Sequence, residues 1–288
     1  MKKLKLGSIQ KMTVEKKIAE GFVLKHDDHE VFLSDEEAPD NIELNEQIDV
    51  FLYNDKKRGI VATSTLPDAT LDSYDWGEVT EVVKNLGVFV DIGIEKEMLV
   101  SKDDLPYMEK VWPQVGDMLF VSLEEDKKGR LLAKPIKEGE VMEDLEAAPK
   151  ELLHKETVAR VYGTTKAGSF VLTEEGHRGF IHPTERKQEP RLGETVNGRI
   201  IDVKEDGTVN ISLRPLKQDS MSEDADAILE YLERNGGEMA FHDKSDPDEI
   251  RNTFSISKAA FKRALGMLMK AGKIEQKDGI TSLKQKKQ

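Results

Sequence analysis

The sequence contains no cysteine, and this absence excludes disulfide bonds and thiolate chemistry. It has no apolar run near the ~20 residues that span a bilayer, and its basic start, Met1 to Leu6, lacks an apolar stretch of signal-peptide length. We therefore expect a cytoplasmic protein with no membrane partner. Aromatic residues make up only 6% of the chain, so the position of each one in a predicted strand is informative.

A positive net charge is missing as well. The formal net charge is −13, which weighs against nonspecific binding to nucleic acid, because phosphate contacts need lysine and arginine. The charge is uneven: residues 1–17 carry six lysines and one glutamate, and residues 256–274 carry five basic residues and no acid. An acidic body with local basic patches predicts selective, weak binding to a single strand.

Motifs for catalysis are also missing. There is no glycine-rich phosphate loop and no His-Glu-x-x-His, and carboxylate pairs carry no information in so acidic a chain. The compact group His26-Asp27-Asp28-His29 contains metal-binding residue types, but its composition is typical of a solvated turn. We therefore expect no enzymatic activity, no cofactor and no metal.

An internal repeat indicates the architecture. The segments Leu44–Val50, Val115–Val121 and Leu192–Gly198 align without gaps, at spacings of 71 and 77 residues. Each one continues through an acidic or lysine-bearing turn into another apolar strand. Spacings of this size fit one small barrel per copy, so the repeat predicts three tandem barrels.

The stretch from Gly77 to Gly93 is the most informative part of the repeat. Two β-rich runs, with Val79 in the first and Val90 in the second, flank Asn85-Leu86-Gly87, which is a hairpin signal. Charged residues interrupt both runs, so each strand is expected to have one face in water. On that face Phe89 would offer a ring on which a base can stack.

These residues resemble the RNA-binding repeat named after ribosomal protein S-one, a five-stranded OB-type barrel. Its pattern is Gly-x-Val, then Gly-x-Phe-Val followed by an acid, and the matching residues are Gly77, Val79, Gly87, Phe89, Val90 and Asp91. Where the family has a histidine this copy has Ser101, and where it has the preceding glycine this copy has Met98. The resemblance therefore implies weaker RNA binding by the second barrel.

The third copy keeps the pattern best. Gly168 to Leu172 repeats the Gly-x-Phe-Val element, and Gly179-Phe180-Ile181-His182 restores the histidine. In the family these side chains share one barrel face, so the resemblance implies stacking by Tyr162, Phe170 and His182, worth ~1–3 kcal/mol per base. Arg178 and Arg199 would contact phosphate. The alternative is that Phe170 belongs to the barrel core and His182 is an ordinary surface residue.

From Ser220 the apolar period changes from 2 to 3.6. One helix is expected to begin near Ser222, a second at Asp246-Pro247 and a third after Ser257, before a hairpin about Asp278-Gly279. Three helices and a hairpin resemble a winged helix. The third helix carries four cations, which either contact nucleic acid or form a solvated basic face: Lys258, Lys262, Arg263 and Lys270.

The sequence thus predicts a mainly β protein with a small α+β domain. The expected domains are a degenerate S-one-like barrel at 1–65, S-one-like barrels at 70–138 and 151–216, and a winged helix at 220–288. The residues expected to contact RNA are Leu86, Phe89, Arg130, Tyr162, Phe170, Arg178, His182, Arg199, Lys258, Lys262, Arg263 and Lys270.

This layout resembles the conserved virulence factor B family of bacterial RNA-binding regulators along the whole chain. The resemblance implies cytoplasmic binding of single-stranded RNA, a role in gene regulation and no catalysis. Two alternatives stay open: a protein-interaction scaffold on the ribosome or RNA polymerase, and a DNA-binding regulator that acts through the winged helix. The oligomeric state is left open by the sequence.

Overall fold

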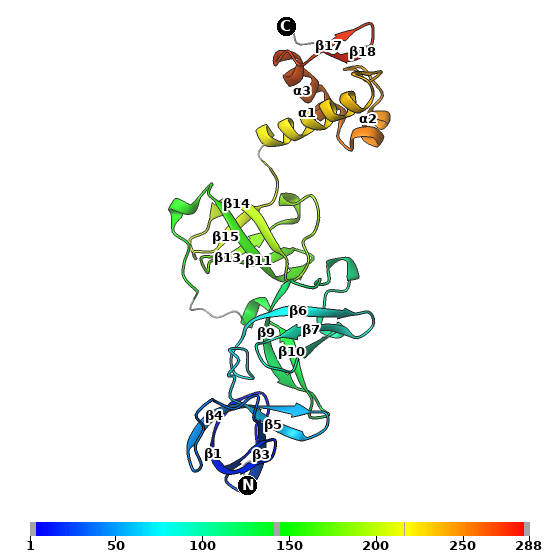
Figure 1. Ribbon diagram of the computed structural model, residues 1–288. Coiled ribbons are helices and arrows are strands. Elements are labelled where there is room, and N and C mark those ends of the chain that lie inside the picture. The colour runs from blue at the N-terminus through cyan, green and yellow to red at the C-terminus, as the bar shows by residue number, and fades with distance from the viewer. Residues whose placement is uncertain (1–3, 141–144, 216, 285–288) are drawn as a thin grey trace. The chain divides into compact units, whose positions relative to one another are not determined.

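The computed structural model describes residues 4–140, 145–215 and 217–284, and the chain divides into two compact units, residues 1–213 and 214–288 (Figure 1). Among the described residues, the first unit holds three closed barrels of five strands each, and the second holds three helices with a three-stranded sheet. The predicted fold class is confirmed. No helix in the described ranges has the length and apolar character needed to cross a membrane.

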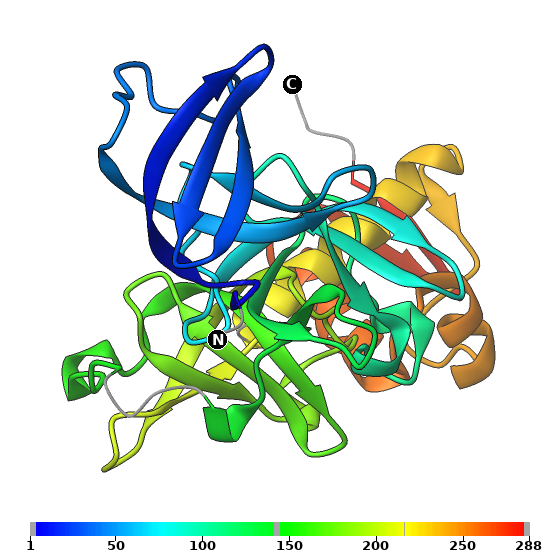
Figure 2. The same cartoon turned by 90° about the horizontal axis from the view of Figure 1, so that it is seen from below.

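The first barrel has the strand order β1-β2-β3-β5-β4. Its strands curve round a common centre in Figure 1, and Figure 2 shows the same blue barrel from another side. Alternate residues of each strand point inward, and the core includes the fully buried Val14, Leu24 and Leu33. The strands are β1 (Ile9–Ile18), β2 (Gly21–His26), β3 (His29–Ser34), β4 (Gln47–Asp55) and β5 (Gly59–Thr63).

The second barrel has the order β10-β8-β7-β6-β9, which is the same ring of neighbours. Val79, Val90 and Val100 are completely buried at its centre. The strands are β6 (Asp75–Val83), β7 (Gly87–Asp91), β8 (Met98–Ser101), β9 (Met118–Glu125) and β10 (Leu131–Pro135). Two 3₁₀ turns, η1 (Lys102–Asp104) and η2 (Glu109–Val111), lie between β8 and β9.

The third barrel has the order β11-β12-β13-β15-β14. Its core includes Val161, Val171 and Ile181, all fully buried. The strands are β11 (Glu156–Thr165), β12 (Gly168–Thr173), β13 (Arg178–Ile181), β14 (Thr195–Val203) and β15 (Val209–Ser212). The 3₁₀ turns η3 (Glu138–Glu140) and η4 (Lys150–Leu152) precede it, and η5 (Pro183–Glu185) follows β13.

The aligned segments of the repeat turn out to begin in turns rather than in strands. Their second residues, Asn45, Gly116 and Gly193, have φ of 67°, 88° and 85°. Each strand starts two residues later, at Gln47, Met118 and Thr195. The gapless match therefore reflects a left-handed turn residue, which favours glycine and asparagine, ahead of each fourth strand.

A second repeated device is a glycine in the first hairpin of each barrel. Gly21, Gly87 and Gly168 all have positive φ at the start of their second strands. At Gly87 a Cβ atom would lie 2.0 Å from the carbonyl oxygen of Val100, so no other residue fits there without moving β8.

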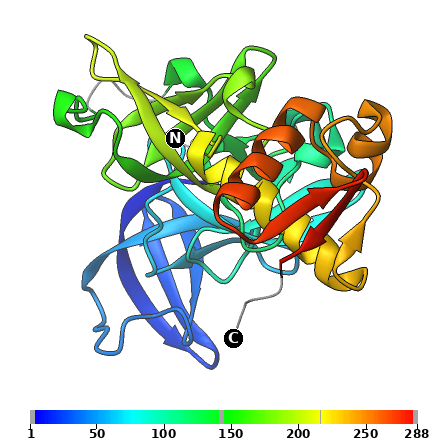
Figure 3. The same ribbon diagram turned by 90° about the horizontal axis from the view of Figure 1, so that it is seen from above.

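The second unit has the layout of a winged helix, and Figure 3 shows its red hairpin beside the orange helices. Its helices α1 and α3 pack through Ile228, Leu232 and Leu265, which are completely buried. The first helix begins at Lys217, earlier than the expected start near Ser222. The elements are α1 (Lys217–Arg234), β16 (Glu238–Met239), α2 (Pro247–Phe254), α3 (Lys258–Lys270), β17 (Ile274–Lys277) and β18 (Ile280–Leu283), with sheet order β16-β18-β17.

Both predicted helix starts in the second half of this unit are capped as the sequence indicated. The carboxylate of Asp246 accepts from the backbone N–H groups of Asp248 and Glu249 at the start of α2. The hydroxyl of Ser257 accepts from the N–H of Ala260 at the start of α3.

Candidate nucleic-acid interface

The outer face of the third barrel carries two neighbouring aromatic rings. Phe170 on β12 pairs directly with Phe180 on β13, and their ring centroids are 5.2 Å apart. Residues on either side of Phe170, Ser169 and Val171, are buried in the barrel, so Phe170 points outward and is half-buried. Phe170 is therefore absent from the core of the third barrel and packs instead against the buried Tyr162 at the barrel junction.

A glycine makes room for this pair. Gly168 starts β12 with φ of 153°, and a Cβ atom there would lie 2.4 Å from Cζ of Phe180. The glycine of the Gly-x-Phe element thus lets the ring of Phe180 lie against the strand beside Phe170. Phe180 is part of the sequence motif, although it is absent from the residues predicted to contact RNA. The signal was available, because Phe180 and His182 are two residues apart and so belong to one face of the strand.

His182 extends the same face and is exposed. Its Nδ1 accepts from the backbone N–H of Thr184, at 3.3 Å, and lies 2.7 Å from the Thr184 hydroxyl oxygen. Because Nδ1 faces a backbone donor, the neutral ring carries its proton on Nε2. The ring is therefore oriented by the chain while its other nitrogen remains a donor.

Tyr162 does not belong to this open face, which corrects its expected role. It is 2% exposed, and its ring centroid lies 6.4 Å from that of Phe120 and 6.2 Å from that of Phe170. Its hydroxyl donates to Glu138, and burial together with that carboxylate raises the pKa of Tyr162 above its ordinary value. A β-bulge between Val161 and Gly163 turns the side chain out of the barrel and into the junction with β9.

The two arginines expected on the third barrel differ. The guanidinium of Arg178 donates to the same Glu138 carboxylate, and its side chain is 30% exposed, so it is engaged rather than free for phosphate. Arg199 on β14 is half-buried, and its guanidinium has no hydrogen bond or ion pair with any described residue. Arg199 is therefore the better placed of the two cations.

The second barrel has a poorer face. Phe89 on β7 is half-buried and pairs with Leu99 rather than with a second aromatic ring. Leu86, 43% exposed, lies in the adjoining turn. Ser101 stands where the third barrel has His182, and its hydroxyl accepts from the N–H of Asp103. Arg130 is held by Asp126, with Nε donating at 2.8 Å, so its expected RNA contact would require that ion pair to open.

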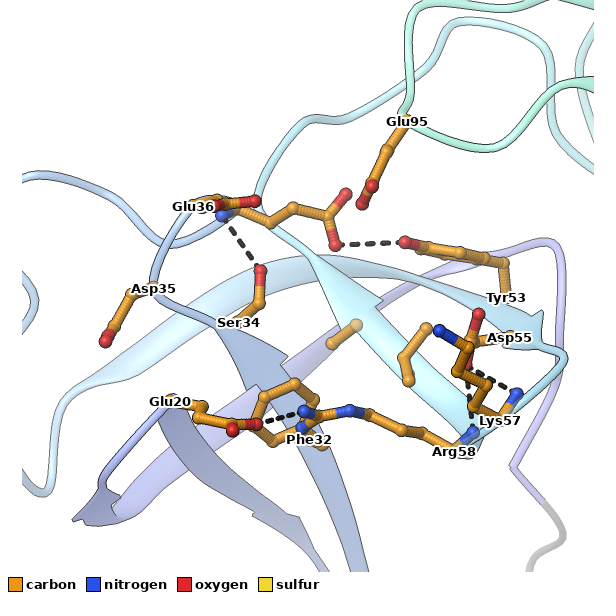
Figure 4. Close-up of a pocket in the computed structure, with 13 residues that line it drawn as sticks. Glu20, Phe32, Ser34, Asp35, Glu36, Tyr53, Asp55, Lys57, Arg58 and Glu95 are labelled. Atoms are coloured by element: carbon orange, nitrogen blue, oxygen red, sulfur yellow. Dashed lines mark hydrogen bonds and ion pairs between the residues drawn. The ribbon is translucent and has the colours of Figure 1, made fainter.

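The first barrel differs, because the aromatic ring on its outer face is covered. Phe32 on β3 stands at the position of Phe180, but the guanidinium of Arg58 lies 4.0 Å above its ring and pairs with Glu20 (Figure 4). Beside them is a pocket of about 480 Å³ lined by six acidic and two basic residues. One of its acids, Glu37, accepts from the hydroxyl of Tyr53, and burial raises the pKa of Glu37. These carboxylates repel phosphate.

The lysines near the N-terminus do not form the expected basic patch. Lys5 pairs with Asp72 at 2.6 Å, and the lysines of β1 also have acidic neighbours. Those pairs are Lys11 with Asp49, Lys16 with Glu30 and Lys17 with Asp35. Lys2 and Lys3 lie outside the described residues. The acidic residues of the barrel thus neutralise the cations that the sequence places beside one another.

In the second unit, the basic face of α3 is present. Lys262, Arg263 and Lys270 are exposed, and no described acid pairs with any of them. Lys258 is half-buried at the start of the helix, and its ammonium group donates to the carbonyl of Lys244 at 3.3 Å. Three of the four expected cations are therefore available to a phosphate backbone.

The second and third barrels are joined by polar and aromatic contacts. Arg191 donates from Nε and Nη2 to the two carboxylate oxygens of Asp117, at 3.0 Å each, and hydrogen bonding to Asp117 raises the pKa of Arg191. The guanidinium of Arg160 lies 4.8 Å from the ring of Trp76. A bidentate ion pair of this kind fixes direction as well as distance, so the turn ahead of β9 and the turn ahead of β14 meet in a defined way.

Comparison with known families assigns all four parts of the chain. Residues 6–65 match the model described as S1 domain, and residues 74–134 match the CvfB first S1-like domain. Residues 143–215 match the second domain of the virulence regulatory factor CvfB, and residues 226–283 match the CvfB-like winged helix domain.

Relatives along the full chain agree with this assignment. The protein named Uncharacterized protein YitL of Bacillus subtilis is 47% identical over 261 residues, which cover 91% of this chain and 88% of that one. Conserved virulence factor B of Staphylococcus epidermidis is 36% identical over 98% of this chain and 95% of its own. A crystal structure of a multidomain protein with nucleic acid binding domains from Streptococcus pneumoniae is 40% identical, with a TM-score of 0.67, over 97% of this chain and 98% of that one.

Proposed function

The chain belongs to the conserved virulence factor B family, and on that premise we propose that it binds single-stranded RNA in the cytoplasm as a non-catalytic regulator of gene expression. Its relatives include a virulence factor and a protein with nucleic acid binding domains, which supports this class of function. The third barrel is the proposed reader of RNA, and the winged helix adds phosphate contacts.

The observation that carries the proposal is the outward pair Phe170 and Phe180, with His182 beside it. Two partly exposed rings on adjacent strands form a platform on which bases stack irrespective of sequence. With Nδ1 facing the N–H of Thr184, Nε2 of His182 can donate to a base or phosphate oxygen. Because the rings project from closed strands rather than from a loop, the platform exists before RNA arrives.

Such a platform favours single strands over duplexes. In an RNA duplex the bases are stacked on one another and their faces are covered, so Phe170 and Phe180 find no surface to contact. Electrostatics point the same way, because the net charge of −13 gives little attraction to a dense array of phosphates.

The exposed cations of α3 would contribute a nonspecific contact. Lys262, Arg263 and Lys270 lie on one helix of a winged-helix domain, a class that places its third helix against nucleic acid. Few such cations are available, so their contribution is expected to be modest and sensitive to salt.

A titration separates this function from its alternatives. We expect a short unstructured RNA to bind more tightly than the same RNA annealed to its complement, measured by fluorescence anisotropy of the labelled strand. Equal affinity for both forms would contradict reading by the barrel face. Tighter binding to duplex DNA would favour regulation through the winged helix, and no binding to any nucleic acid would favour a scaffold on the ribosome or RNA polymerase.

A further inference from the structure

A second hollow adjoins Phe170, at the junction between the second and third barrels. It has a volume of about 290 Å³, and Phe170 forms one of its walls. The buried side chains of Tyr162 and Ile136 lie beneath it and form one apolar cluster with Phe120. Its size is near the lower end of small-ligand pockets, ~300–1,000 Å³, so it has room for a single base.

One side of this hollow is an unpaired strand edge. The residues Gly163–Thr165 of β11 line it and pair with β12 on their other side. The neighbouring strand β14 pairs with β11 only from Glu156 to Arg160, and no described strand continues along the edge beyond. The backbone N–H and C=O groups of such an edge can form hydrogen bonds with the polar groups of a ligand.

The rim of the hollow is mainly acidic, because it carries three acids, Asp103, Asp104 and Glu138, and one lysine, Lys137. Glu138 is already bound by Tyr162 and Arg178, and Asp104 has Lys134 at 3.9 Å. The carboxylate of Asp103, by contrast, is exposed and receives no hydrogen bond from any described residue. A carboxylate only accepts hydrogen bonds. The Asp103 carboxylate therefore repels phosphate and attracts the edge of a base that carries N–H donors.

We infer that this hollow is a guanine-selective subsite for the single strand, with the base lying against Phe170 beside the β11 edge and its N1–H and 2-amino groups donating to Asp103. Guanine presents two adjacent N–H donors on its pairing edge, which match the two oxygens of one carboxylate. Adenine and cytosine place an acceptor beside their amino group, and uracil places carbonyls on both sides of its single N–H. The inference rests on the proposed function, because it assumes that a single strand already lies across Phe170.

The occupant is a base of that strand rather than a separate metabolite, because the hollow is continuous with the proposed interface through Phe170. The strand's phosphates stay outside the acidic rim. The subsite would therefore add sequence preference to a platform that by itself stacks all bases alike.

The test compares two fluorescein-labelled oligocytidines of about seven nucleotides, identical except for one central guanosine. We expect the parent protein to bind the guanosine-containing oligomer roughly tenfold more tightly, the usual size of a bidentate base contact. Replacing the guanosine by inosine, which lacks the 2-amino group, should remove part of that preference. Asp103→Asn should remove it and leave affinity for plain oligocytidine unchanged.

Glu109→Gln is the matched control. Glu109 is an exposed acid of the same barrel outside the hollow, and its removal should leave the guanosine preference intact. All three proteins must share one melting temperature, which surface exchanges of acid for amide should permit.

The outcomes separate this inference from the proposed function. Equal binding of the two oligomers by the parent, or a guanosine preference that survives Asp103→Asn, overturns the subsite while RNA binding stands. A preference lost equally in Glu109→Gln assigns it to overall charge and also overturns the subsite. If the parent binds neither oligomer, the proposed function itself fails.

Discussion

The third and first barrels share a backbone plan but have opposite outer faces. Both have the same order of strands, a bulge in the first strand and a positive-φ glycine at the start of the second. On the third barrel Phe170 and Phe180 lie side by side. On the first barrel the position of Phe170 holds Val23, and Phe32, the counterpart of Phe180, lies under Arg58.

This difference shows where function resides in the repeat. Inward residues such as Leu24 and Val171 are fully buried in both barrels and keep the closed fold. The outward residues of the same strands are free to change, because a side chain on the wet face adds little to the core. One barrel can therefore display rings while another displays carboxylates, and the second barrel, with Phe89 beside Leu99, is intermediate.

The sharpest test of this comparison is Phe170→Ala. Loss of a stacking ring should cost ~1–3 kcal/mol, or roughly tenfold to a hundredfold in affinity for single-stranded RNA. Anisotropy titration of the same unstructured RNA measures the effect. Phe170 also contacts Tyr162 at the barrel junction, so the variant must first show the parent's melting temperature. A folded variant that binds RNA like the parent would contradict the proposal that the third barrel reads the RNA.

Phe89→Ala should have a smaller effect, below about tenfold, because the face of the second barrel starts with one ring and Ser101 in place of a histidine. The same titration, run beside Phe170→Ala, gives the ranking directly. If Phe89→Ala proves the more damaging of the two, the second barrel is the reader. The better motif of the third copy would then reflect fold alone.

The sequence predicted the parts of this comparison that depend on local pattern. Three closed barrels followed from the repeat, the Gly-x-Phe element placed Phe89 and Phe170 on outward positions, and the change to a 3.6-residue period found the helices. These features are set by alternation and by turn glycines, both of which can be seen within a few residues.

What the sequence did not predict depends on contacts between distant segments. Tyr162 is buried because Phe120 of another barrel packs against it, and Arg178 is engaged because it donates to Glu138, which lies 40 residues earlier in the chain. The ring of Phe32 is covered by Arg58, which comes from the turn after β4. No periodicity encodes such pairings, because they are fixed only when the strands close and the barrels meet.

A weaker test concerns the cations of α3. Lys262→Ala combined with Arg263→Ala should weaken RNA binding severalfold at low salt and by less at high salt. For a single strand each lost phosphate contact lowers the slope of log affinity against log salt by about 0.7. Titrations at several salt concentrations measure this slope. An unchanged slope in the double variant would indicate that α3 forms a solvated basic face and takes no part in binding.

The smallest effect is expected on the first barrel, where Phe32→Ala should leave RNA affinity unchanged although Phe32 is the counterpart of Phe180. Arg58 and Glu20 cover the ring, and the neighbouring pocket holds six acidic residues that repel phosphate.

Because Phe32 also packs against buried residues, Arg58→Gln provides a second variant that spares the core. It removes the cation above the ring but leaves the carboxylates, so it too should bind RNA like the parent. A severalfold gain with Arg58→Gln would mean that Arg58 alone keeps RNA off this barrel, and a loss with folded Phe32→Ala would make the first barrel a reader. Either result would contradict the proposed difference in RNA binding between the outer faces of the first and third barrels.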